Sequence, residues 1–261
     1  MIPGRSLTWS PAVEITDLGG NAVAEHEVTA VLGAQGAVLI SAADRDTVTD
    51  FLRPFVDVHR HPHAEPHGWT LIHPGDGSGT AENGRGFSRS ALFPHTDRSS
   101  VEVPPSLLCF LMLGAAGTGG EALLADTAPA VRRVGADHLR ANQGQLWLRD
   151  AQGNGRRQVF SLNGDLCVVR YRADEVAAPA AESAAGAALL SELRTSAAAA
   201  GAFSLRPGDG YLIHNHRVLH GRTAFTGERR CARLLGRVRE DSPYAWLNSG
   251  YRIGEQRVPE G

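Results

Sequence analysis

From residue 106 onward, short apolar or alternating runs separated by glycine-containing turns limit the possible folds more than any other feature of the sequence. The runs lie at 106–113, 121–125, 145–149, 157–162, 166–171, 202–206, 210–214, 217–220 and 231–239. Runs of this length are typical of antiparallel strands, and an Ala-rich segment at about 180–200 is typical of an inserted helix. The pattern predicts a mainly β protein: a double-stranded β-helix (jelly-roll) barrel with flanking α-helices.

The first 90 residues have a more mixed pattern. We expect short strands and two helices, at 12–16, 22–33, 36–40 and 44–58. Asp44 is the expected cap of the second helix, and Pro54 is expected to break or kink it. Residues 59–90 are rich in His, Pro, Gly, Ser and Asn and lack periodicity, which makes them a lid candidate. We expect a single domain over 1–261, with a core at about 12–239 and a tail at 240–261.

Composition excludes several classes of function. All 26 basic residues are arginine, so Schiff-base chemistry and a P-loop lysine are excluded. A formal charge of −2 gives no support for a nucleic-acid or anionic-membrane partner. We expect no transmembrane helix and no secretory signal, and the odd count of three cysteines suits a reducing cytoplasm. The residues do not determine the oligomeric state.

The pair His95 and Asp97 is the first candidate for a metal site. Residues i and i+2 of a strand point to the same face, so both side chains would converge while Thr96 points away from the site. Two histidines and one carboxylate on one face of an iron leave three positions open for substrate and dioxygen. A rival exists at His63 and Glu65, within a cluster interrupted by two prolines. That cluster, which we interpret as a solvated or lid loop, comprises His59, His61, His63 and His67.

The segments around and after His95 carry a family resemblance. They are "GTGGEALLAD" at 117–126, "PGDGYLIHNHRVLHGRTAF" at 207–225 and "RRCARLLGRV" at 229–238. In type, order and separation over residues 12–239, the chain resembles the taurine dioxygenase and clavaminate synthase-like branch of the iron(II)/2-oxoglutarate-dependent oxygenases.

The resemblance implies roles for four residues. His95 and Asp97 match the first two iron ligands, and His220 matches the distal histidine. Arg233 matches the arginine that binds the distal carboxylate of 2-oxoglutarate, and a fixed cation suits the far end of a dicarboxylate. Arg230 is the alternative to Arg233, although strand alternation would turn it to the other side.

Other residues in the motifs have alternative interpretations. His214 and His216 have even spacing from His220 and are alternatives to it as the third ligand. Arg222 is expected to pair structurally with a carboxylate beside the barrel, and Asp126 to cap a turn or helix. In relatives, the residue after "GGE" is commonly Thr or Ser, whose hydroxyl helps to hold 2-oxoglutarate. Ala122 has no hydroxyl, which puts the affinity for the cosubstrate in doubt.

The resemblance implies hydroxylation or desaturation of an amino acid, peptide or specialised-metabolite intermediate, with dioxygen consumed and succinate and carbon dioxide released. Halogenating relatives lack the carboxylate that Asp97 supplies, so its presence favours hydroxylation or a related oxidation such as desaturation over halogenation. The candidate substrate residues are Trp69, Ser99, Arg170 and Arg172. Two rival functions remain: a non-redox, cupin-like jelly-roll metalloprotein, and a binding module that has lost turnover.

Overall fold

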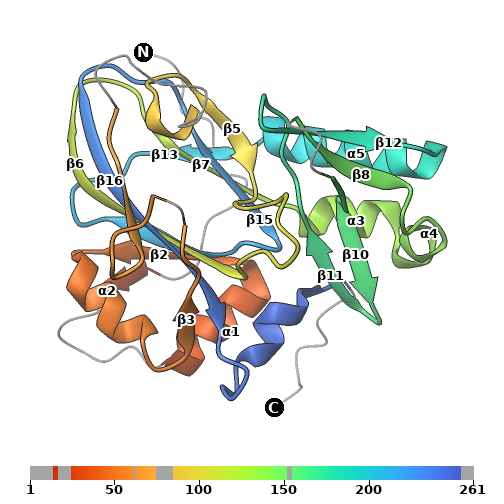
Figure 1. Ribbon diagram of the computed structural model, residues 1–261, viewed down its shortest axis with the longest axis horizontal. Coiled ribbons are helices and arrows are strands. Elements are labelled where there is room, and N and C mark those ends of the chain that lie inside the picture. The colour runs from red at the N-terminus through yellow and green to blue at the C-terminus, as the bar shows by residue number, and fades with distance from the viewer. Residues whose placement is uncertain (1–13, 17–24, 62, 75–84, 152–154, 254–261) are drawn as a thin grey trace.

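The computed structural model describes residues 14–16, 25–61, 63–74, 85–151 and 155–253 (Figure 1). Its strands are β1 (Glu14–Thr16), β2 (Ala37–Ser41), β3 (Val56–Val58), β4 (Trp69–Ile72), β5 (Leu92–His95), β6 (Leu107–Ala116), β7 (Ala122–Asp126), β8 (Leu146–Asp150), β9 (Arg156–Gln158), β10 (Phe160–Asn163), β11 (Leu166–Val169), β12 (Ala177–Ala181), β13 (Gly201–Phe203), β14 (Gly210–His214), β15 (Val218–Arg222), β16 (Glu228–Val238) and β17 (Tyr251–Arg252). Its α-helices are α1 (Glu25–Gln35), α2 (Arg45–Leu52), α3 (Ala128–Val134), α4 (Ala136–Ala141) and α5 (Ala184–Ala198), with short 3-10 helices η1 (Arg85–Phe87) and η2 (Ala245–Ser249). The chain is mainly β, as the sequence predicts.

The largest sheet has seven strands in the order β1-β2-β14-β6-β16-β3, and β4 also pairs with β16. Helices α1 and α2 cover its outer face, where Leu32 and Leu52 pack with Cys109 and Leu234 in one buried apolar cluster. Successive residues of a strand point to opposite faces. Phe110 and Arg233, which are next to Cys109 and Leu234 in sequence, therefore point to the inner face of the sheet.

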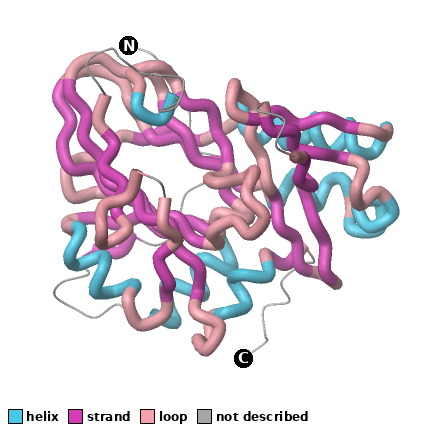
Figure 2. The backbone as a smooth tube through the Cα atoms, viewed as in Figure 1, coloured by secondary structure: helices cyan, strands magenta, loops and turns pink. Residues whose placement is uncertain are grey.

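A second, antiparallel sheet has the order β13-β7-β15-β5. Its inner face shares a buried cluster with the inner face of the large sheet, which contains Phe110 and Tyr211 from the large sheet and Ala122 and Leu124 from the small one. The two sheets therefore pack face to face, with the helices outside them (Figure 2). Among the described residues the two sheets remain separate and do not close into a barrel.

Two three-stranded sheets form the remainder of the β structure, in the orders β12-β8-β9 and β10-β11-β17. They pack with α3, α4 and α5 around a separate apolar cluster that includes Leu139, Leu148, Val169 and Leu193. Leu219 of β15 belongs to the same cluster. The outer face of the small sheet is thereby covered, which keeps water from the back of the strand that carries His220.

The N-terminal elements differ from expectation in their boundaries. Asp44 caps α2 as expected, its carboxylate accepting a hydrogen bond from the Thr47 amide at 2.8 Å. The helix ends at Leu52 rather than continuing to residue 58, because Pro54 has no amide hydrogen with which to continue it. The chain instead becomes the strand β3, which pairs with β16. The expected strand at 157–162 is divided into β9 and β10.

The lid candidate at 59–90 contains ordered structure in its middle. Residues Trp69–Ile72 form β4, which pairs with Cys231–Leu234 of β16. The lack of periodicity there gave no sign of this strand, and the role of the segment as a lid stays a prediction. Residue 62 and residues 75–84, also within the candidate, lie outside the described residues.

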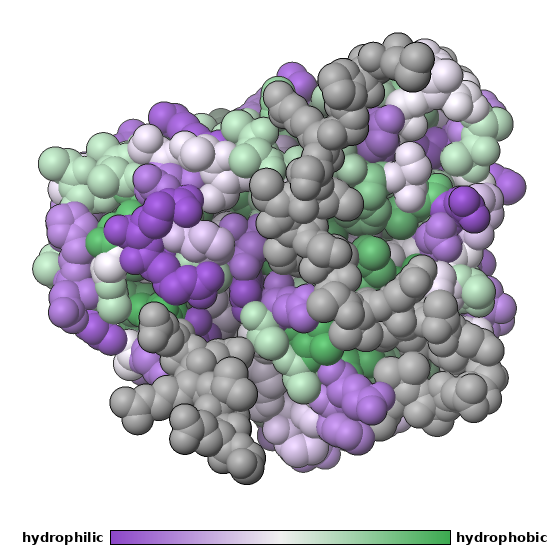
Figure 3. All heavy atoms as spheres, turned by 180° about the vertical axis from the view of Figure 1, so that it is seen from behind, coloured by the Kyte–Doolittle hydropathy of each residue, from purple (hydrophilic) through white to green (hydrophobic). Residues whose placement is uncertain are grey.

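The described surface is mixed in character. Hydrophilic and hydrophobic residues are interspersed on the face opposite to that of Figure 1 (Figure 3). Within the described residues, no helix combines the length and the apolar character that crossing a membrane requires.

Candidate metal centre and adjoining cavity

Strands β5 and β15 bring the two histidine ligand candidates together. His95 and His220 are paired directly across the antiparallel ladder, so their side chains share one face. Their ring centroids are 4.6 Å apart. Gly221 permits this close approach of the strands, because a Cβ at this position would lie 2.4 Å from the Leu92 carbonyl oxygen.

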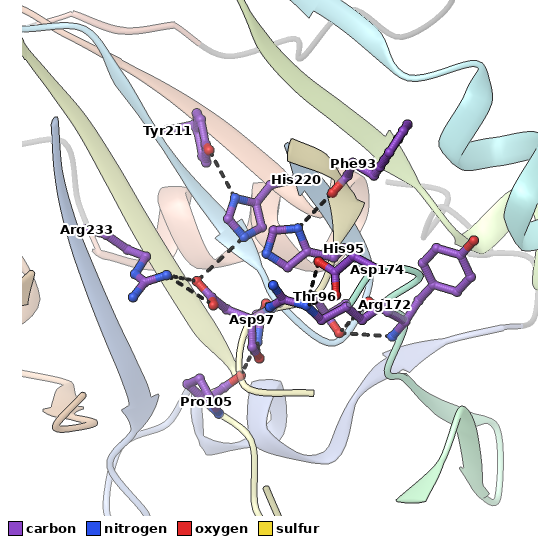
Figure 4. A network of polar contacts seen from close by, with 12 residues as sticks. Phe93, His95, Thr96, Asp97, Pro105, Arg172, Asp174, Tyr211, His220 and Arg233 are labelled. Carbon is purple, nitrogen blue, oxygen red and sulfur yellow. Dashed lines mark hydrogen bonds and ion pairs between the residues drawn. The ribbon is translucent and has the colours of Figure 1, made fainter. Parts of the chain in front are cut away.

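Asp97 completes a group of three buried side chains. One potential ligand atom from each of His95, Asp97 and His220 lies within 4.8 Å of the others. The Nε2 atom of His220 is 3.6 Å from Oδ2 of Asp97 (Figure 4). This is the set of side chains predicted from the sequence, and the tertiary structure brings all three together.

The histidines are oriented by contacts at their other ring nitrogens. Nδ1 of His95 lies 2.9 Å from the carbonyl oxygen of Phe93, and Nδ1 of His220 lies 3.3 Å from the hydroxyl of Tyr211. In each ring a hydrogen on Nδ1 leaves the lone pair on Nε2 available as a ligand. Nε2 of His220 is buried and has no hydrogen-bond partner. An orphaned nitrogen facing a carboxylate fits a bound divalent metal ion, and two histidines with one carboxylate fit iron(II).

The electrostatics keep His95 and Asp97 in the protonation states that a metal requires. Burial, followed by the charges of Arg172 and His220, lowers the pKa of His95 to about 3, so its ring is neutral at neutral pH. Burial alone would raise the pKa of Asp97. The charge of Arg233, together with the nearby His220, more than offsets that effect and holds the pKa of Asp97 well below its usual range.

A cavity that is partly open to solvent adjoins the three ligand candidates at His220. Its lining includes Phe110, Ala122, Tyr211, His220, Arg229 and Arg233. Nη1 of Arg233 donates to both carboxylate oxygens of Asp97, at 3.2 and 2.9 Å. Arg233 therefore lies at the Asp97 end of the cavity.

Arg229 is a second buried cation in the same cavity, and the sequence prediction does not include it. Its guanidinium lies over the rings of Phe110 and Phe225, at 5.4 and 5.6 Å from their centroids, and its Nε is buried without a hydrogen-bond partner. Strand alternation could have identified it, because residues 229 and 233 share one face of β16. Arg230, the alternative to Arg233, is exposed.

The other histidines lie elsewhere. Within the described residues, the three-membered group contains His220 and neither His214 nor His216. Nε2 of His214 donates to the Leu247 carbonyl at 2.8 Å, on the far side of β14. His61 of the histidine cluster lies close enough for Asp97 and Arg233 to affect its pKa, which burial lowers to about 4, but it is not part of the group.

Two motif residues have structural contacts. Arg222 donates to the backbone carbonyls of Arg85, Ser88 and Ser90 instead of the expected carboxylate. The Arg222 side chain thereby holds the segment 85–90 against β15 through three main-chain carbonyls. Asp126 caps the turn before α3 by accepting from the Ala128 amide at 2.9 Å, and it also pairs with Arg217.

The candidate substrate residues are not all near the metal centre. Trp69 is wrong as a lining residue: it pairs with Leu234 in the ladder, so it faces the outer core, and its Nε1 donates to Thr49 Oγ1 at 2.9 Å. Ser99 is buried in the turn that contains Asp97. Arg170 donates to the carbonyls of Val101 and Glu102.

Arg172 is the candidate that the structure brings to the metal centre. It lies beside His95 and Asp97 (Figure 4). Its Nε donates to both carboxylate oxygens of Asp174, at 2.8 and 2.9 Å. Thr96 points away from the ligands, as expected, since its hydroxyl accepts from the Tyr171 amide at 3.0 Å.

The fold and the site define a class of protein: a mainly β protein in which two histidines and a carboxylate form a buried metal centre beside a cationic cavity, as in non-haem iron oxygenases. The family model described as "Taurine catabolism dioxygenase TauD, TfdA family" matches residues 10–145 and 137–237. The chain belongs to this family.

Solved structures support the same fold at low sequence identity. PvcB from Pseudomonas aeruginosa is 17% identical with a TM-score of 0.59, covering 82% of this chain and 80% of its own. An asparagine oxygenase in complex with Fe(II), 2S,3S-3-hydroxyasparagine and succinate is 19% identical, with a TM-score of 0.60 and coverages of 80% and 76%. The non-haem iron oxygenase OrfP, in complex with Fe, succinate and (3S)-hydroxy-L-Arg, is 12% identical, with a TM-score of 0.58 and coverages of 77% and 76%. No curated protein sequence matches this chain significantly.

Proposed function

We propose that this protein is an iron(II)- and 2-oxoglutarate-dependent oxygenase that hydroxylates a small substrate related to an amino acid or peptide. The observation that carries the proposal is the buried group of His95, Asp97 and His220 beside a cavity that contains two arginines. Family membership supports it. When bound there, iron supplies the activation of dioxygen, with 2-oxoglutarate converted to succinate and carbon dioxide as a C–H bond of the substrate is oxidised.

The two arginines suggest how the cavity binds 2-oxoglutarate. Arg233 is paired with Asp97, whereas the described contacts of Arg229 are with aromatic rings. A Cβ at Gly120 would lie 3.2 Å from the Arg229 side chain, so Arg229 is close to the segment in which relatives supply the Thr or Ser hydroxyl. We therefore assign the distal carboxylate of 2-oxoglutarate to Arg229 in place of Arg233. Arg233 adds positive charge at the Asp97 end.

Arg172 is the best candidate for a contact with the substrate. Asp174 holds its Nε, and this orients the guanidinium beside His95. A fixed guanidinium can donate two parallel hydrogen bonds to a carboxylate, which suits an amino-acid substrate. The asparagine oxygenase and OrfP contain hydroxylated amino acids, which agrees with this substrate class. Asp97 as a ligand favours hydroxylation over halogenation.

We infer that the two facing sheets are the halves of a double-stranded β-helix and that residues 1–261 form one domain. The inner clusters that the sheets share support this arrangement. Cys109, Cys167 and Cys231 are buried free thiols, which supports a reducing compartment, the cytoplasm.

Succinate formation tests the proposal. The iron-loaded protein is incubated with 2-oxoglutarate and dioxygen, with and without pools of amino acids and small peptides, and succinate that rises with one fraction is the expected result. Anaerobic addition of 2-oxoglutarate to the iron-loaded protein should also produce a metal-to-ligand charge-transfer band at about 500 nm. Iron binding without that band would contradict the proposal and favour a cupin-like metalloprotein. A band without succinate in any fraction would favour a binding module, which the missing hydroxyl at Ala122 makes chemically reasonable.

A further inference from the structure

The backbone of Asp97 lies outside the regular sheet. Strand β5 ends at His95, and the last ladder pair of that strand joins His95 to His220. The chain then turns, with Arg98, three residues after His95, in the left-handed region at φ 54°. The amide and carbonyl of Asp97 therefore lack a strand partner, although the residue is buried. Buried backbone groups require hydrogen bonds, and a ligand requires a fixed backbone.

The side chain of Asn215 takes the place of a strand partner. Its Oδ1 accepts from the Asp97 amide at 2.8 Å, and its Nδ2 donates to the Asp97 carbonyl at 3.0 Å. Nδ2 also donates to the carbonyl of Pro105 at 2.8 Å. Asn215 is fully buried, and its own amide donates to the Ser106 carbonyl at 2.8 Å. One carboxamide thus satisfies both backbone groups of Asp97 and joins the two ends of the turn that follows it.

We infer that Asn215 is a positioning residue that fixes the Asp97 carboxylate for metal binding by clamping the Asp97 backbone. The inference rests on the proposed role of Asp97 as an iron ligand. Its physical basis is that the two opposed hydrogen bonds restrict rotation of the peptide groups on both sides of the Asp97 Cα, and so restrict the direction of its Cβ. Without the clamp, the turn at Arg98 would allow the carboxylate to move away from the two histidines. Asn215 lies in the turn between β14 and β15, five residues before His220, so one short segment of chain influences the positions of two ligands.

The chain contains a matched control for this clamp. Asn248 binds the backbone of Val238 in the same way: its Oδ1 accepts from the Val238 amide at 3.1 Å, and its Nδ2 donates to the Val238 carbonyl at 2.6 Å. It also accepts from the Ser106 hydroxyl at 2.7 Å. None of these contacts involves residues 95–97. Asn248→Ala therefore removes a similar number of hydrogen bonds from the backbone without touching a ligand segment.

The test compares wild type, Asn215→Ala and Asn248→Ala as full-length, metal-free protein. The affinity for Fe(II) is measured by anaerobic calorimetry, the visible spectrum of bound Co(II) reports the ligand geometry, and thermal unfolding reports stability. We expect Asn215→Ala to weaken Fe(II) binding by about 10- to 100-fold, the range typical of residues that hold metal ligands. Its Co(II) spectrum should also change. Asn248→Ala should lose stability but keep Fe(II) affinity within about twofold, because it alters no contact of the kind that tunes a metal ligand.

The outcomes separate this inference from the proposed function. If the wild type does not bind Fe(II), both are wrong. If the wild type binds iron but Asn215→Ala binds it equally well, or if both variants lose affinity in proportion to stability, only the clamp is wrong. Should Asn215→Ala not fold, Asn215→Ser is used instead, since its hydroxyl keeps a small polar group at the position. Wild-type Fe(II) affinity in a folded Asn215→Ser protein would overturn the clamp in the same way.

Discussion

Replacing Arg229 with methionine tests how the cavity holds the cosubstrate. A guanidinium that binds a carboxylate through two charge-assisted hydrogen bonds contributes about 1.5 kcal/mol or more from each. Ala122 lines the same cavity and supplies no hydroxyl that could share the distal carboxylate with Arg229. Arg229→Met should therefore weaken 2-oxoglutarate binding by about 3 kcal/mol, which is a factor of about 150 in Kd.

The same substitution should leave the stability of the free protein nearly unchanged. Among the described contacts, the Arg229 guanidinium is buried against two aromatic rings without a carboxylate. Methionine avoids the cost of burying that charge and loses the contact of the cation with the rings, so the free energy of unfolding should change by less than about 1 kcal/mol. A change of that size distinguishes a binding residue from a residue that the fold requires.

Anaerobic titration of the iron-loaded protein with 2-oxoglutarate, followed by the charge-transfer band, measures the affinity directly. Arg230→Met is the matched control, because Arg230 is the next residue of β16 and is exposed on the other face. It should bind 2-oxoglutarate like the wild type. If Arg229→Met also binds normally and Arg233→Met does not, the distal carboxylate belongs to Arg233 and the reasoning from the cavity is refuted.

Three further predictions concern the ligands, the substrate and pH. Alanine at His95, Asp97 or His220 should abolish turnover and weaken iron binding by more than about 100-fold, because mutating residues that only hold the ligands in place already lowers metal affinity by about 10- to 100-fold. Converting the histidines of the cluster at 59–67 to glutamine should leave the iron stoichiometry unchanged. Arg172→Ala should raise the substrate KM by about tenfold, or about 1.4 kcal/mol, while the KM for 2-oxoglutarate stays constant, and an equal rise in both would contradict a substrate contact. Burial lowers the pKa values of His95 and His214, to about 3 and about 4, and that of His216 well below its usual range. Below pH 6.5 the unfolded chain therefore binds up to three more protons than the native protein at these positions. As the pH falls from 6 to 4.5, the free energy of unfolding of the metal-free protein, measured with urea, should fall by up to about 4 kcal/mol per pH unit. A free energy of unfolding that does not change with pH would mean that these rings are charged in the native protein.

Several features of this protein could be predicted from local sequence. The period-2 runs and their glycine-containing turns identify most strands after residue 106, because alternation depends only on neighbouring residues. The spacing of His95 and Asp97 predicts that their side chains converge, although β5 ends at His95, and the resemblance adds His220. Those predictions agree with the group of three that the structure brings together.

Other features depend on contacts between residues far apart in the chain. Trp69 lies in a segment without periodicity, and only its pairing with Leu234 decides that it faces the outer core. Strand alternation places Arg229 and Arg233 on the same face, but only the tertiary structure shows that both line one cavity and that Arg233 is paired with Asp97. The clamp from Asn215 to Asp97 spans 118 residues of sequence. Local patterns determine which way a side chain points along its own strand, whereas strand pairing and packing decide what it meets there, and the chemistry of this site depends on both.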